Sequence, residues 1–363
     1  MEQFTQTQVF HQHLSEDDAL AFLDENIGKT FKNCVKRTEN QEVTIMASRK
    51  GRLTTLVKNT AIKTVPPAKD AAAQTIGQSL SRKKNHLIPE GKPVPFLILL
   101  GIMTSDGKVI ASRQDKFRQI NRFLEFIDDV LDDVCAQIRQ ENRTAIRIAD
   151  FGCGKSYLTF AVHYFLTEVK KIPCEIEGLD LKQDVIAYCN QIAQKLSLDN
   201  LIFKTGDISG YSGDKNPDIV ITLHACDTAT DFALRYAVAH GAKAILSVPC
   251  CQHQVNGQLD AEKRRKIAGQ SPEFEPLLKW GIIREKFSSL VTDALRGKFL
   301  EQHGYRVQML EFIDIEHTPK NILIRAVRDA HQKNRGDSDC PADFSEPALS
   351  RALEISPEIW MNL

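Results

Sequence analysis

The sequence predicts an α/β protein with a doubly wound, mostly parallel sheet of seven strands and a smaller α+β unit before it. Two observations carry this prediction. Strand-like and helix-like segments alternate from about residue 115 onwards, which is typical of a parallel sheet with helices on both faces. The last two strand-like segments are separated by a short turn alone, and such a link joins antiparallel neighbours.

The alternating region begins with a helix at 115–139, in which apolar residues recur at helical spacing. Parallel strands are predicted at 146–150, 174–179, 201–205, 218–223 and 242–248. Helices are predicted at 157–171, 183–196, 228–240 and 290–304. The closing antiparallel pair is predicted at 305–313 and 321–327, with a turn at 316–320.

We predict three parts along the chain. Residues 1–112 form an N-terminal substrate-recognition unit, with a helix at 14–27, strands at 42–47 and 53–57, and a buried strand in the apolar run 95–103. Residues 113–330 form the main domain. Its insertion at about 254–289 is too long for a simple connection, so we expect a lid or a substrate-facing element. Residues 331–363 are expected to be an acidic tail.

Charge is distributed unevenly. Basic and acidic residues both total 47, but the segment 29–92 holds 14 basic residues against four acidic ones. A basic segment in a neutral chain indicates a polyanionic partner, and we expect RNA, such as tRNA or rRNA. Aromatic residues are sparse there, so recognition of a folded RNA backbone is favoured over base stacking. The basic run 263–266 is a candidate for a second phosphate contact.

The sequence predicts a cytoplasmic protein. The first residues are polar and acidic and do not resemble a signal peptide. The longest apolar run, 95–103, is too short to span a bilayer. Nine cysteines occur without a Cys-x-x-Cys pair, which indicates free thiols in a reducing compartment.

The most informative motif ends the first strand of the main domain, in the run Asp150-Phe-Gly-Cys-Gly154. Its glycines let the backbone turn sharply and approach a ligand closely. A P-loop, matched loosely by 149–156, would place the anionic Asp150 among phosphates. A dinucleotide site wants a third glycine where Tyr157 stands, and Asp150 would repel its pyrophosphate. Both alternatives stay open, but the acid favours a cationic nucleoside without phosphates.

Two further acids follow the next two strands. Asp180 ends the second strand, where a carboxylate can accept both ribose hydroxyls of a nucleoside. Asp207 ends the third strand, where it can accept the adenine amino group while Ile208 covers the ring. Helix capping is the alternative role for each of these two acids. Three acids at three successive strand ends favour S-adenosylmethionine, which is cationic at its sulfur and its amino group.

These residues resemble the motifs of class I S-adenosylmethionine-dependent methyltransferases over 115–328. The resemblance implies a Rossmann-like sheet and S-adenosylmethionine as the cofactor. Two further motifs, at 223–231 and 247–253, are similar to a branch that includes the eukaryotic tRNA acceptor-stem 2′-O-methyltransferases. The fourth-strand motif departs from that branch in detail, and the zinc-finger modules are missing. The expected cofactor-binding residues are Asp150, Phe151, Gly152, Cys153, Gly154, Asp180, Leu181, Asp207, Ile208 and His224.

In such a sheet, the tips of the fourth and fifth strands face the methyl group. The candidate catalytic residues there are His224, Asp227, Cys250, Cys251 and His253. Transfer is an in-line displacement, and an oxygen acceptor needs a base, such as either histidine or Asp227. Purely structural roles, a covalent pyrimidine adduct on a cysteine, and a zinc site that includes Cys226 are the alternatives. We expect no metal.

The sequence therefore predicts an S-adenosylmethionine-dependent methyltransferase that acts on RNA, at a ribose oxygen or a base nitrogen. Two other functions stay open. One is methylation of a small molecule or a protein. The other is RNA binding without catalysis by a protein that has a methyltransferase fold.

Overall fold

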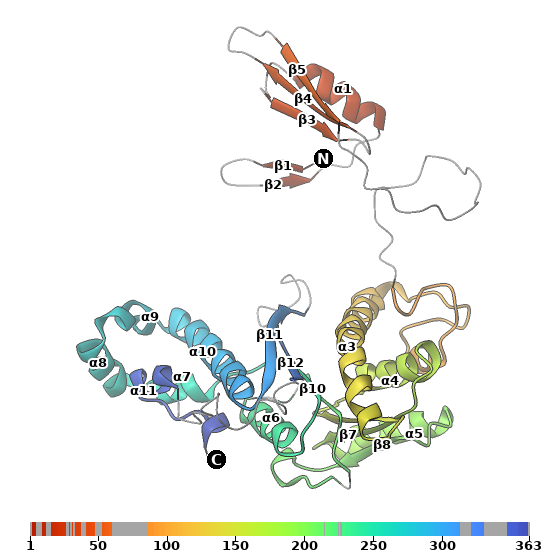
Figure 1. Ribbon diagram of the computed structural model, residues 1–363, viewed down its shortest axis with the longest axis vertical. Coiled ribbons are helices and arrows are strands. Elements are labelled where there is room, and N and C mark those ends of the chain that lie inside the picture. Colours follow the sequence, from red (N-terminus) through yellow and green to blue (C-terminus); the bar gives the residue numbers. More distant parts are fainter. Residues whose placement is uncertain are drawn as a thin grey trace. The chain divides into compact units, whose positions relative to one another are not determined.

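A computed structural model of the 363-residue chain describes residues 2–4, 9–11, 16–26, 29, 31, 33–37, 41–47, 53–59, 86–213, 215–223, 225, 227–312, 321–329 and 347–361. The chain forms two compact units, Met1–Arg82 and Lys83–Leu363 (Figure 1). The large unit contains the predicted sheet and begins well before the predicted boundary at 113.

The described residues of the small unit form one helix and two antiparallel sheets. Its elements are β1 (Glu2–Phe4), β2 (Val9–His11), α1 (Glu16–Asn26), β3 (Asn33–Arg37), β4 (Gln41–Ala47) and β5 (Leu53–Asn59). β4 lies between β3 and β5, and β1 pairs with β2. The helix and the last two strands are those that the sequence predicted. Most of the expected RNA-binding segment 29–92, including 60–85, lies outside the described residues.

The large unit is built on the seven-stranded sheet that the sequence predicted, and its strands follow the order β11-β12-β10-β9-β6-β7-β8. The five strands from β10 to β8 are parallel to one another, and β12 and β11 complete the other edge of the sheet as antiparallel strands. Their bounds are β6 (Ile146–Phe151), β7 (Cys174–Asp180), β8 (Leu201–Thr205), β9 (Ile219–Thr222), β10 (Ala244–Ser247), β11 (Tyr305–Glu311) and β12 (Ile322–Arg328). The strand order reverses between β6 and β9, and ligands of such sheets bind at that reversal.

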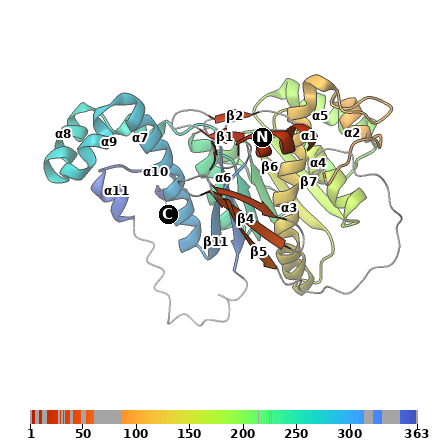
Figure 2. The same cartoon turned by 90° about the horizontal axis from the view of Figure 1, so that it is seen from above.

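Helices cover both faces of this sheet (Figure 2). One core packs α3 (Gln114–Gln140), α4 (Tyr157–Tyr164) with its π-helical continuation Phe165–Val169, and α5 (Gln183–Lys195) against the strands. The other core packs α6 (Thr228–Ala239) and α10 (Gly281–Gln302) on the opposite side. No helix in the described part of the chain is long and apolar enough to cross a membrane.

The apolar run 95–103 is not the predicted strand. It forms helix α2 (Pro95–Leu99), preceded by β-like Val94. Proline suits the first turn of a helix because its missing N–H would have no partner there. Gly101, at a φ of 67°, then reverses the chain. Leu97 and Ile102 are fully buried in the core with α3, so this run belongs to the large unit.

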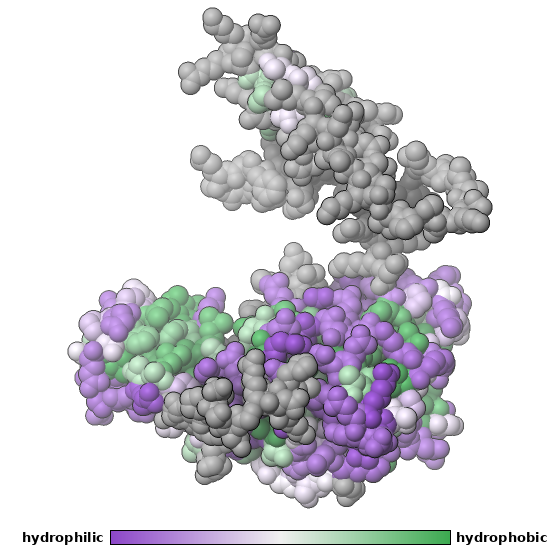
Figure 3. All heavy atoms as spheres, viewed as in Figure 1, coloured by the Kyte–Doolittle hydropathy of each residue, from purple (hydrophilic) through white to green (hydrophobic). Residues whose placement is uncertain are grey.

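The insertion after β10 is helical. It comprises α7 (Gln254–Gln258), α8 (Ala261–Gln270), α9 (Glu275–Lys279) and the first turns of α10, which begins nine residues before the predicted helix at 290. These helices share a small core with Leu353 and Ile355 from the segment 347–361. That segment contains α11 (Ala348–Ala352) and the turn Glu358–Trp360, so the end of the expected acidic tail is packed. Apolar side chains also gather on the surface of the insertion, including Trp280 and Ile282 (Figure 3).

Candidate functional site

The glycine-rich turn is fixed by backbone hydrogen bonds to the next strand. The N–H groups of Gly152 and Cys153 donate to the carbonyl oxygen of Leu179, at 2.8 and 3.1 Å. Gly152 and Gly154 have φ values of 70° and 51°, a region that other residues rarely adopt. A Cβ atom on Gly154 would meet no heavy atom within 4 Å, so it would project into open space. The turn therefore forms a cradle that a side chain would fill.

A cavity of about 180 Å³ opens beside this turn. It lies where the strand order reverses, because its lining joins the end of β6 to Leu223, just after β9. The residues that line it include Asp150, Gly152, Gly154, Tyr157, Leu223 and Lys116. The structure thus brings part of the predicted cofactor site together around one hollow.

A larger hollow of about 550 Å³ lies over β6, β7 and β8, away from the glycine-rich turn. Its charged side chains satisfy one another: Glu175 pairs with Lys215 at 2.7 Å and Glu177 pairs with Lys204 at 3.0 Å. The smaller cavity has the unusual backbone and an acid, Asp150, that forms no ion pair among the described residues. It is therefore the better candidate for a ligand site.

Asp150 is the electrostatic centre of the small cavity. Its side chain is buried, and its Oδ2 accepts a 2.5 Å hydrogen bond from the hydroxyl of Thr159. Burial raises the pKa of Asp150 to about 7, Thr159 acts in the opposite direction, and the charge of Asp180 adds to the rise. A cationic ligand group would favour the charged carboxylate, whereas a phosphate would not.

Asp180 supports the same turn from the end of β7. Its Oδ2 accepts from the N–H of Gly154 at 2.9 Å, and its Oδ1 accepts from the N–H of Lys182 at 3.0 Å. Each carboxylate oxygen has a second lone pair, which can accept a hydrogen bond from a hydroxyl group of a ligand. Leu181 follows with 71% of its side chain exposed, so it offers an apolar surface to a ligand.

Asp207 and Ile208 lie at the end of β8. The Oδ1 atom of Asp207 accepts from the N–H of Ser209 at 2.9 Å and caps the short turn Ile208–Gly210. The capping role is therefore present. Ile208 packs partly against the second core. Neither residue lines the small cavity, so an adenine-binding role would require a ligand that extends beyond it.

Phe151 differs from its expected role. Its side chain is 1% exposed and points into the second core, where its ring contacts those of Tyr211 and Tyr236 edge-on. Alternation along β6 explains this, because neighbouring side chains of a strand face opposite sides of the sheet. Phe151 therefore supports the site through packing.

Lys116 also lines the cavity, although it was not among the site residues expected from the sequence. It lies on α3, well before the glycine-rich turn in the sequence, and burial lowers its pKa. Its Nζ donates to Gln119 at 2.7 Å and lies 5.2 Å from the ring centre of Tyr157. No local motif marks such a lysine, because only the packing of α3 against α4 brings it to the turn.

The loops after β9 and β10 are joined by Asp227. Its Oδ1 accepts from the N–H groups of His253 and Gln254, at 2.9 and 3.1 Å, and its own N–H donates to the carbonyl oxygen of Cys251 at 3.1 Å. The structure therefore brings Asp227, Cys251 and His253 together, as predicted from the sequence. His224, expected in both the catalytic and the cofactor set, lies outside the described residues, as does Cys226.

The two neighbouring cysteines take part in no disulfide among the described residues. Cys250 and Cys251 are half-buried, and His253 is exposed. Within the described ranges, no three His, Cys, Asp or Glu side chains are arranged to hold a metal ion. The alternative zinc set includes Cys226, which those ranges omit.

Residues 115–258 match the sequence model of a family described as a methyltransferase domain. Curated relatives include the mouse "Glutathione S-transferase C-terminal domain-containing protein", 23% identical over half of this chain and 30% of that protein. Its homolog from Drosophila pseudoobscura pseudoobscura is 34% identical over 29% of this chain and 17% of that protein. The chain thus spans a third or less of the length of these relatives.

Solved structures with a similar fold include methyltransferases. One is magnesium protoporphyrin IX methyltransferase from Synechocystis with bound SAH, 16% identical over 62% of this chain and 90% of that chain, with a TM-score of 0.34. Another is an rRNA methylase from Streptococcus thermophilus, 13% identical over 58% and 96%, with a TM-score of 0.35. These values are too low to bear on the substrate.

The match of residues 115–258 covers β6 to β10, and therefore the glycine-rich turn and the loops joined by Asp227. The buried Asp150 beside this turn fits S-adenosylmethionine, a cofactor with positively charged groups. Residues 115–258 therefore resemble a methyltransferase domain.

Proposed function

We propose that this protein transfers the methyl group of S-adenosylmethionine to RNA, at a ribose oxygen or a base nitrogen. The observation that carries the cofactor half is Asp150, a buried acid that faces a cavity at the reversal of the strand order. The observation that supports RNA is the excess of ten positive charges in the segment 29–92.

The cavity residues suit the amino-acid end of the cofactor. We assign Asp150 to its ammonium group and Lys116 to its carboxylate, because both side chains line the cavity and carry the complementary charges. We assign Asp180 to the ribose hydroxyls and Leu181 to the apolar face of the adenine. When bound, the cofactor supplies a methyl group on a positively charged sulfur, which makes that carbon electrophilic.

The chain contributes placement and, for an oxygen acceptor, a proton acceptor. The loop after β9 borders the cofactor cavity, since Leu223 lines it. The loop after β10 begins beside it, since the N–H of Val248 donates to the carbonyl oxygen of Thr222 at 2.9 Å. His253 is exposed next to these loops, so it is the described residue best placed to accept a proton from an acceptor hydroxyl.

Within RNA, a folded molecule such as tRNA or rRNA is the proposed substrate. The basic segment contains few aromatic residues, so it suits phosphates held in a fixed geometry better than splayed bases. The second basic run offers less support. Lys263 donates to the carbonyl oxygen of Glu354 at 3.0 Å, and Lys266 pairs with the carboxylate of Glu354 at 2.7 Å.

Labelled methyl transfer tests this proposal. The purified protein and tritiated S-adenosylmethionine are incubated with total RNA, protein and metabolite extracts, with Asp150→Ala as the loss variant. Asp132→Asn is the matched control, because it removes an exposed charge from α3. We expect label in RNA for the wild type and the control only. Label confined to protein or metabolites would contradict the RNA substrate, and cofactor binding without any transfer would contradict catalysis.

A further inference from the structure

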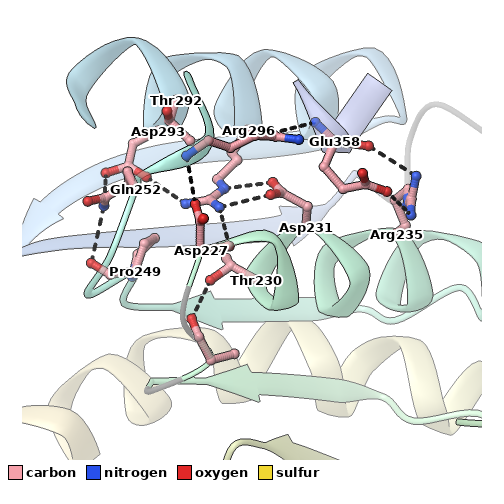
Figure 4. A network of polar contacts seen from close by, with 12 residues as sticks. Asp227, Thr230, Asp231, Arg235, Pro249, Gln252, Thr292, Asp293, Arg296 and Glu358 are labelled. Atoms are coloured by element: carbon pink, nitrogen blue, oxygen red, sulfur yellow. Dashed lines mark hydrogen bonds and ion pairs between the residues drawn. The ribbon is translucent and has the colours of Figure 1, made fainter. Parts of the chain in front are cut away.

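A cluster of buried polar residues in the large unit adjoins the loops after β9 and β10 (Figure 4). At its centre is Arg296, which is 0% exposed and belongs to α10, outside the segment that matches the methyltransferase family. A buried guanidinium is costly unless all its donors are used. Stability alone therefore does not explain why Arg296 is buried at this position.

The guanidinium of Arg296 contacts three different elements. Its Nε and Nη2 donate to the two carboxylate oxygens of Asp231 on α6, at 2.8 and 3.0 Å. Its Nη1 donates to Asp293, one turn earlier on α10, at 3.0 Å. Its Nη2 also donates to the backbone oxygen of Asp227, at 2.7 Å. Burial works against its charge, but the two acids hold the pKa of Arg296 above its usual range.

Asp227 is held in an unusual backbone conformation. Its φ and ψ are 51° and −121°, a combination that glycine adopts and other residues avoid. Such strain persists only where the surroundings fix it, and it concentrates at functional sites. Here the backbone oxygen is fixed by Arg296, and the side chain accepts from His253 and Gln254. The strained residue thus joins the two loops.

The loop after β10 has a second link to the same cluster. The amide nitrogen of Gln252 donates to Asp293 at 2.9 Å and to the backbone oxygen of Pro249 at 3.3 Å. Gln252 is buried and follows directly after Cys250 and Cys251. The backbone on both sides of the cysteine pair is therefore tied, through Asp293, to Arg296.

We propose that Arg296 is a positioning residue for methyl transfer, which it serves by holding the loops after β9 and β10 in one fixed arrangement through Asp227, Asp293 and Gln252. The inference rests on the proposed function, since these loops would place the acceptor. It also assigns Asp227 a role as a structural link, in place of the base that the sequence suggested. A misplacement of about 1 Å can slow an in-line reaction by about 100-fold.

Paired substitutions at Asp227 separate these two roles. In Asp227→Asn, the amide oxygen can accept the same two N–H groups, and asparagine tolerates a positive φ. We expect this variant to keep most of the transfer rate, and Asp227→Ala to lose about 100-fold in kcat while KM for the cofactor stays within about threefold. If Asp227 were the base, asparagine would lose about 100-fold or more as well, and the proposal would be overturned.

Substitutions in the cluster test Arg296 itself. Arg296→Lys keeps the charge but cannot serve Asp231, Asp293 and the backbone of Asp227 together. Gln252→Met keeps the volume and removes one link, and the Oε1 that it deletes has no partner among the described residues. If Arg296→Lys fails to fold, Gln252→Met still decides. We expect both to lower kcat with unchanged cofactor affinity, and Asp132→Asn to change neither.

Amide hydrogen exchange of the peptide 248–258 gives a readout that needs no substrate. We expect faster exchange in this peptide in Asp227→Ala, Gln252→Met and Arg296→Lys, and wild-type exchange in Asp227→Asn. Unchanged exchange in the first three variants would refute the link between the loops. If the wild type methylates no RNA, the proposed function fails, and exchange still decides whether Arg296 fixes these loops.

Discussion

The two halves of the site at the carboxyl edge of the sheet differ in how their buried acids are paired. On the side of β6 and β7, Asp150 is buried with one hydroxyl donor and forms no ion pair in the described part of the chain. On the side of β9 and β10, Asp231 and Asp293 share the guanidinium of Arg296. The comparison separates an acid that lacks a cation from acids whose cation is built in. The unpaired acid is suited to binding a cationic ligand, and the paired acids are suited to holding the structure of the loops.

The largest expected effect is on stability without ligand. The rise in the pKa of Asp150 from 3.8 to about 7 means that the folded protein binds a proton more tightly than the unfolded chain. Stability therefore falls as the pH rises from about 4 to 7, by roughly 4 kcal/mol at most. We expect Asp150→Asn to remove this loss and to raise the free energy of unfolding at pH 8, but not at pH 4. Urea unfolding at both pH values checks this.

The same substitution, Asp150→Asn, should weaken binding of the cofactor. Without the negative charge, we expect the affinity of Asp150→Asn for S-adenosylmethionine at pH 8 to fall by about 100-fold. Below pH 7, binding to the wild type must displace a proton, so wild-type affinity should decrease as the pH falls. Calorimetry in two buffers of different ionisation enthalpy measures the released proton. A pH-independent wild type with no proton release would contradict the assignment.

A smaller loss is expected at Lys116. If Lys116 binds the cofactor carboxylate, Lys116→Met should lower the affinity for S-adenosylmethionine by about tenfold. This is about the contribution of one charge-assisted hydrogen bond. Methylthioadenosine lacks the amino-acid part of the cofactor and serves as the control ligand. Its affinity should not change, and an equal loss for both ligands would place Lys116 elsewhere in the site.

The smallest effect is expected at Leu181. Truncation to alanine should cost about 1 kcal/mol of cofactor binding, because it removes apolar contact area that only the ligand would cover. The free energy of unfolding should stay within about 0.5 kcal/mol of the wild type, since Leu181 is largely exposed. Ile202→Ala, on an exposed face of β8, is the matched control and should change neither quantity.

Much of the fold could be predicted because it depends on local sequence patterns. The alternation of segments located all seven strands of the sheet, and the short link between the last two set their direction. Asp150 and its glycines were also found from the sequence, because the turn requires special residues in adjacent positions. The helix at 95–99 was missed, because a short apolar run fits a buried strand and a buried helix equally well.

The missed site residues share a different cause. Lys116 and Arg296 lie on long helices at opposite ends of the large unit's sequence, and each reaches the site only through tertiary packing. Phe151 was expected among the cofactor-binding residues because the motif was considered as a unit, whereas its side chain packs in the second core. Sequence patterns report neighbours along the chain, and these roles depend on neighbours in space.

The packed segment 347–361 has a consequence for how the protein is made. Ile359 and Trp360 lie against the core between α6 and α10, and Leu353 and Ile355 complete the core of the helical insertion. The side chain of Arg235 on α6 also pairs with Glu358 at 2.9 Å. During synthesis, α6 and α10 leave the ribosome before this segment. Their apolar surfaces are therefore exposed to water until the segment 347–361 has been synthesised and packs against them.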